Sequence, residues 1–84
     1  MGRWLVVGDG GVLAIDRIVA VAQARSAPIH RLAEAVGVEW MVDLTFGQSR
    51  EAVVVLDSGH VVAVSLTPEE LVHRLREVED ERTR

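Results

Sequence analysis

The chain has 84 residues, a net charge of −4, no cysteine and 49% hydrophobic residues. This length allows one small domain, and the lack of cysteine excludes disulfides and zinc–thiolate clusters as its stabilising elements. No apolar run approaches the roughly 20 residues that a membrane-spanning helix needs, so we expect a cytoplasmic protein with no membrane partner.

The first quarter of the chain predicts short strands. Apolar runs at 4–7, 12–15 and 18–22 contain the β-branched residues that favour strands. The glycine-rich segment 8–11 predicts a turn between the first two runs, and Asp16-Arg17 interrupts the apolar pattern before the third. The glycines match neither a Walker loop nor a dinucleotide fingerprint, so they indicate a turn and no nucleotide cofactor.

A helix is predicted to begin after Ser26. Ser26 is a residue type that caps free N–H groups, and Pro28 is tolerated within a first helical turn. Apolar residues then recur at helical spacing, at Ile29, Leu32, Ala33 and Val36. Gly37 is a natural stop in the left-handed conformation.

Three further strands are expected in the middle of the chain. The first covers 40–45, a loop follows at 46–49, and a tight turn at 57–60 joins strands at 52–56 and 61–64. The last two strands are nearly all valine, which is typical of strands covered on both faces. A domain this small cannot hide all its apolar residues, so we expect a neighbouring subunit to supply one of the covers.

The best-marked helix follows Thr67. Thr67 with Glu70 forms a capping-box pattern, and Pro68 suits the first helical position. Leu71, Val72, Leu75 and Val78 line one face of this helix. We therefore expect one α+β domain over residues 1–78, with a small, mainly antiparallel sheet system and two helices, and a fraying polar tail at 79–84.

Residues that could carry catalysis or bind a metal show no supporting pattern. His30, His60 and His73 lie too far apart in the chain to match a metal-ligand spacing. The turn 57–60 places an acid, a hydroxyl and an imidazole close in sequence, but a tight turn offers no room for a substrate or an oxyanion hole. We therefore expect a protein that is not an enzyme, with no metal, no cofactor and no small-molecule substrate.

Four arginines are candidates for binding phosphate: Arg17, Arg25, Arg31 and Arg50. Arginine is better suited to phosphate than lysine, because its planar guanidinium group donates two parallel hydrogen bonds in a fixed geometry. The same four residues can equally be a solvated surface, and an acidic protein has no general attraction to nucleic acid. Asp43 and Asp57 do not form an evident carboxylate pair, and we expect them to act as caps or turn residues at strand ends.

Five motifs occur in a characteristic order along the chain: Ser26-Ala27-Pro28-Ile29 followed by Arg31, Asp43-Leu44-Thr45-Phe46-Gly47, the segment 52–61, Pro68-Glu69, and Arg74-Leu75. Together they resemble the RemA-like family of bacterial regulators, from Leu5 to about Leu75. The resemblance implies a DNA-binding transcriptional regulator of biofilm-matrix genes that assembles into closed rings. Its partners would be double-stranded DNA and further copies of the same chain.

The resemblance also implies which residues contact DNA. The family's arginine ahead of the first helix matches Arg17, and we expect phosphate clamping by Arg17 and Arg50, supported by Arg31 and Arg25. The family's arginine pair after the loop glycine falls on Gln48 and Ser49, one position before Arg50, and its lysine falls on His30. These missing cations leave a second interpretation open, a diverged oligomeric scaffold that does not bind DNA.

Overall fold

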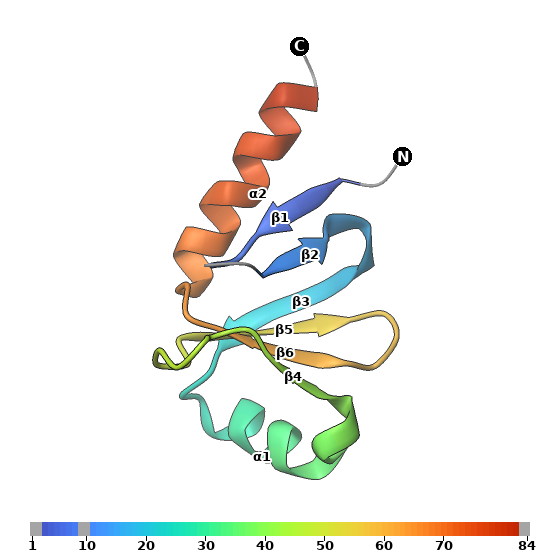
Figure 1. Ribbon diagram of the computed structural model, residues 1–84, viewed down its shortest axis with the longest axis vertical. Coiled ribbons are helices and arrows are strands. Elements are labelled where there is room, and N and C mark those ends of the chain that lie inside the picture. Colours follow the sequence, from blue (N-terminus) through green and yellow to red (C-terminus); the bar gives the residue numbers. More distant parts are fainter. Residues whose placement is uncertain (1–2, 9–10, 83–84) are drawn as a thin grey trace.

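The computed structural model describes residues 3–8 and 11–82, and over this range the chain forms two α-helices and two β-sheets (Figure 1). The predicted α+β class with a mainly antiparallel sheet system is confirmed. The strands are β1 (Trp4–Val6), β2 (Val12–Ala14), β3 (Ile18–Gln23), β4 (Met41–Asp43), β5 (Ala52–Leu56) and β6 (Val61–Val64). The helices are α1 (Ala27–Val36) and α2 (Pro68–Arg82), with 3-10 turns η1 (Ile15–Arg17) and η2 (Val38–Trp40).

The larger sheet has the strand order β3-β5-β6-β4. Its pairs are antiparallel except for β4 with β6, which is parallel. Ile18 at the start of β3 pairs with Leu56, so the β5–β6 turn and the start of β3 share one end of the sheet, here called the hairpin end. At the opposite end, here called the open end, Gln23 of β3 pairs with Ala52 of β5. This register decides which arginines lie near one another.

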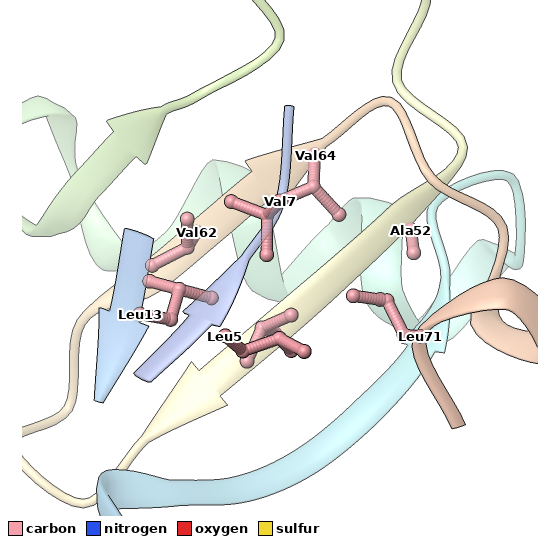
Figure 2. Packing of buried hydrophobic residues seen from close by; sticks show 8 residues of the cluster. Leu5, Val7, Leu13, Ala52, Val62, Val64 and Leu71 are labelled. Carbon is pink, nitrogen blue, oxygen red and sulfur yellow. The ribbon is translucent and has the colours of Figure 1, made fainter. Parts of the chain in front are cut away.

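β1 and β2 form a separate two-stranded ribbon, which lies with α2 on one side of the larger sheet (Figure 1). Leu5 pairs with Leu13 across the ribbon, and both side chains enter the buried core (Figure 2). The turn expected at 8–11 includes Asp9 and Gly10, which lie outside the described residues. The backbone N–H of Val7 nevertheless donates to the carbonyl of Gly11 over 2.8 Å, which closes the ribbon at this end.

β5 and β6 are rich in valine because both of their faces are buried. On one face, Val62 and Val64 belong to the core cluster that also contains Leu71 of α2 (Figure 2). On the other face, Val61 and Ala63 are buried as well, and α1 lies on the side of the sheet away from α2 (Figure 1). The chain therefore covers both faces by itself, and the expectation that a neighbouring subunit supplies one cover is wrong for these strands.

α1 begins where the sequence predicts but is not capped as expected. Ser26 occupies the position before the helix, yet its hydroxyl donates to the carbonyl of Gln23 over 3.2 Å and makes no capping bond to a helix N–H. Gly37 ends the helix with a φ of 83° and a ψ of 162°. That ψ lies outside the left-handed helical region that the sequence predicted, although a positive φ still favours glycine.

α2 has the predicted capping box. The Thr67 hydroxyl accepts the Glu70 backbone N–H over 3.1 Å, and the Glu70 carboxylate accepts the Thr67 backbone N–H over 3.1 Å. The reciprocal pair satisfies two N–H groups that a helix start leaves without partners. The helix continues to Arg82, past the boundary at residue 78 where the sequence predicted a fraying tail.

The segment 40–45 forms less strand than predicted. After Gly37 the chain makes η2, in which the Trp40 N–H donates to the Gly37 carbonyl over 3.2 Å, and only the three residues of β4 then pair with β6. Because the Trp40 N–H is bonded within this 3-10 turn, it is not available to pair with β6 as it would be in a strand. Among the described residues, no helix is both long and apolar enough to span a membrane.

Candidate nucleic-acid interface

Arg17 lies at the hairpin end of the sheet, on η1 directly before β3. Its side chain is 69% exposed, and its guanidinium lies 3.2 Å from the carboxylate of Asp57. The backbone N–H of Asp57 also donates to the carbonyl of Arg17 over 2.8 Å. The two residues are therefore joined by main chain and side chain, and the remaining guanidinium donors face solvent.

Arg50 lies at the open end of the sheet, directly before Glu51 and the start of β5. Its side chain is 52% exposed, and its guanidinium lies 3.3 Å from Oδ2 of Asp43. The other oxygen of Asp43 accepts bonds from the Thr45 hydroxyl over 2.6 Å and the Thr45 backbone N–H over 2.9 Å. Asp43 thus has the turn-making role at a strand end that the sequence predicted, and it also holds Arg50.

The pKa of Asp43 lies below its ordinary value. The main causes are the two hydrogen bonds from Thr45, first from the hydroxyl and then from the backbone N–H, which favour the charged carboxylate. Arg50 adds a smaller lowering through its hydrogen bond and its positive charge, and desolvation opposes it. Asp43 is therefore ionised at neutral pH and carries the charge that attracts Arg50.

Arg25 also lies at the open end, after the last residue of β3. Its side chain is 83% exposed, and its guanidinium lies 3.5 Å from Glu51, which also accepts a bond from the Ser49 hydroxyl over 3.4 Å. Arg25 and Arg50 line the same hollow of about 270 Å³ beneath α1. Arg31 projects from α1, is exposed, and has no ion pair or hydrogen bond with another described residue.

The four arginines therefore do not form one site. Arg25 and Arg50 meet at the open end, whereas Arg17 lies at the hairpin end. The six residues of β3 separate the two ends by roughly 20 Å at the usual strand rise of about 3.3 Å per residue. Phosphates repeat along a DNA duplex, so cations at two separated points of one surface can still contact one duplex.

The carboxylate partners of these arginines are the residues that sequence reasoning missed as functional groups. Arg17 and Asp57 are 40 positions apart, and Arg25 and Glu51 are 26 apart, so only the strand register brings them together. The bond between Asp43 and Thr45 was visible in the sequence, because an aspartate commonly bonds the backbone two residues later. No such local pattern links Asp43 to Arg50.

The histidines and the turn 57–60 do not assemble a catalytic group. His30 and His73 each contact a glutamate four residues later on a helix surface, Glu34 and Glu77. His60 Nδ1 lies 2.7 Å from the Ser58 hydroxyl, and the His60 ring lies tilted by 43° against Trp40, with 4.8 Å between the ring centroids. The neighbouring acid, Asp57, pairs with Arg17 instead of orienting the imidazole. No cluster of three metal-ligating side chains occurs among the described residues.

Two groups of exposed apolar side chains lie on different elements. The first, the ribbon patch, consists of Trp4, Val6 and Val12 on the outward face of β1 and β2, opposite the inward Leu5 and Leu13. The second, the η2 patch, consists of Val38 and Trp40, of which Val38 is 92% exposed. Figure 1 shows the ribbon and η2 on opposite sides of the larger sheet.

Comparison with known proteins gives a consistent match over most of the chain. Residues 4–75 match the family model described as extracellular matrix regulatory protein A-like, or RemA-like. Proteins from Bacillus cytotoxicus, Bacillus mycoides and Bacillus cereus are each 40% identical over 79 residues, which cover 93% of this chain and 91% of theirs. Their names provisionally describe them as regulatory proteins.

Proposed function

Because this chain belongs to the RemA-like family, whose relatives are named as regulatory proteins, we propose that it is a DNA-binding transcriptional regulator acting as a homo-oligomeric ring. By the same resemblance its targets would be biofilm-matrix genes, and it would work in the cytoplasm beside the chromosome. The proposal includes no catalytic step and no cofactor. The observation that carries it is the exposure of arginine side chains at both ends of the sheet, where Arg17, Arg25 and Arg50 face solvent.

Arg17 and Arg50 are the proposed phosphate contacts. Each guanidinium makes a single bond of 3.2 or 3.3 Å to its carboxylate, which leaves most of its five N–H donors for another acceptor. Each contact with a phosphate releases a counterion from the DNA, so binding falls steeply as salt rises. Arg31 and Arg25 would add supporting contacts, because both side chains are exposed and can reach a phosphate.

The net charge of −4 opposes DNA binding and is repeated at every subunit of a ring, so binding depends on many arginine contacts that act together. A ring repeats each arginine at every subunit and holds the copies on one scaffold. After one subunit has bound, the others act at a high effective concentration near the same duplex, so contacts that are weak singly become strong together.

The exposed apolar patches support assembly into a ring. A ring needs a contact between two different surfaces of the same chain, because identical surfaces produce a closed dimer. The ribbon patch and the η2 patch are two such surfaces, on opposite sides of the larger sheet (Figure 1). We propose that they lie in the subunit contacts. Val38→Asp should then lower the particle mass in light scattering, whereas Glu77→Gln on α2 should leave it unchanged.

A gel-shift series tests DNA binding directly. The wild-type chain should retard an AT-rich duplex at low salt, and the double variant Arg17→Ala with Arg50→Ala should lose most of this retardation. Arg76→Ala serves as the matched control, since it removes one exposed arginine that lies on α2 and outside the larger sheet. Retardation that is unchanged in the double variant would contradict the assigned roles.

The second candidate function is a diverged ring that serves as a protein-interaction scaffold without binding DNA. It is favoured by the presence of Gln48 and Ser49 where the family has two arginines, and by the acidic net charge. The two functions separate in the same gel-shift series, because the scaffold would assemble into a large particle yet show no retardation at any salt concentration.

A further inference from the structure

All three arginines at the ends of the sheet are held by a carboxylate of the same chain. The pairs are Arg17 with Asp57 at 3.2 Å, Arg25 with Glu51 at 3.5 Å, and Arg50 with Asp43 at 3.3 Å. The formal charge of each pair is zero. An approaching phosphate therefore meets a guanidinium whose charge is already balanced, beside a carboxylate that repels the phosphate.

The Asp43 pair is the most firmly built of the three. Thr45 is buried, and it fixes one carboxylate oxygen of Asp43 with two hydrogen bonds, so the acid cannot swing away from Arg50. Asp57 is fixed differently, by the backbone bond from its own N–H to the carbonyl of Arg17. Arg31 provides the contrast, since it has no acidic partner among the described residues.

From this geometry we infer that Asp43 and Asp57 are affinity-setting residues of the DNA interface, which weaken phosphate binding by competing for Arg50 and Arg17. This inference rests on the proposed DNA-binding function and names the residues that tune it. Since a bound phosphate must replace or share each carboxylate contact, neutralising the carboxylate makes the arginine a better phosphate ligand. The cations at the two ends of the sheet are thus partly cancelled by the chain's own carboxylates.

The test compares variants that remove charge while keeping shape. Asp43→Asn retains a side-chain oxygen that can accept both hydrogen bonds from Thr45. Asp57→Asn repeats the test on the Arg17 pair, in which Thr45 takes no part. Glu77→Gln is the matched control, because it makes the same change in net charge on α2, where the partner is His73 and no arginine. Binding of each full-length variant to a labelled AT-rich duplex is measured by fluorescence anisotropy, with circular dichroism as the check on folding.

The expected result is a Kd lower by roughly two- to fivefold for each asparagine variant, the range of an exposed ion pair, and a near-wild-type Kd for Glu77→Gln. In a ring, the same substitution is present in every subunit, so the decrease in Kd would be larger than for a single subunit. The gain from Asp57→Asn should also disappear in an Arg17→Ala background, since the carboxylate then has no guanidinium to compete for. If the wild-type chain shows no detectable binding but the asparagine variants do bind the duplex, that result would support the inference equally.

Three results would overturn it. Equal tightening by Glu77→Gln would show that overall charge, and not the local pairs, sets affinity. Suppose that the wild-type chain binds DNA through Arg17 but both asparagine variants bind no more tightly than the wild type. That result would refute the inference and leave the proposed function standing. No binding by the wild-type chain or any variant would refute both.

Discussion

Arg74 of α2 donates a hydrogen bond of 2.7 Å from its guanidinium to the backbone carbonyl of Val6 on β1. The residues are 68 positions apart, and the bond fastens the ribbon to the C-terminal helix. A two-stranded ribbon with strands of three residues is not stable alone, so such contacts keep it folded. Arg74 lies within the part of the chain that matches the family, and its contact here is structural.

Arg74→Ala should therefore destabilise the fold without acting on the sheet-end arginines. We expect a loss of about 1 to 2 kcal/mol in the free energy of unfolding, as for a hydrogen bond made by a charged group. Urea denaturation measures this loss, and Arg76→Ala on the same helix should change the midpoint very little. Equal midpoints for the two variants would show that the contact to Val6 contributes nothing.

Leu71 is the one residue of α2 that is fully buried, among those whose side chains are described. It lies near Ala52 of β5, in the core cluster that also contains Val62 and Val64 of β6 (Figure 2). Leu71→Ala should cost about 2 to 5 kcal/mol, which is a large part of the stability of a domain this small. The neighbouring Val72→Ala, at a position 39% exposed, should cost well under half as much in the same thermal or urea unfolding experiment.

The low pKa of Asp43 gives stability a defined pH dependence. Its pKa is lower in the folded chain than the ordinary 3.8, so the unfolded chain binds more protons in this range. The stabilisation is fully present above about pH 4 and is lost as pH falls through the folded pKa. Thr45→Val should raise the pKa of Asp43 toward 3.8, measured by NMR titration of its carboxyl carbon. An unchanged titration curve would exclude the Thr45 hydroxyl as a cause of the lowered pKa.

Much of the fold could be predicted because its signals are local. The turn at 57–60, the capping box at Thr67 and the limits of β5 and β6 depend on residues adjacent in the chain, and the structure has them where the sequence predicted. The parallel pairing of β4 with β6 was not predicted. Only three residues form it, and a strand that short carries no pattern that specifies its neighbour.

The candidate interface was predicted less completely, for a physical reason. Sequence reasoning selected Arg17, Arg25, Arg31 and Arg50 by residue type, and all four side chains are exposed. It could not place Arg17 apart from Arg25 and Arg50, because their separation depends on the register of β3 with β5. It also missed the carboxylate partners, which are brought to the arginines by the same long-range pairing.

The salt dependence of DNA affinity tests the central claim most directly. Kd is measured by anisotropy across a salt series for the wild-type chain, Arg17→Ala and the control Arg76→Ala. The account predicts a steep linear fall of log affinity with log salt for the wild type and for the control. For Arg17→Ala it predicts a slope smaller by about 0.9 for each phosphate that this arginine neutralises in the wild-type complex. A wild-type affinity that does not change with salt, or one identical slope for all three proteins, would contradict it.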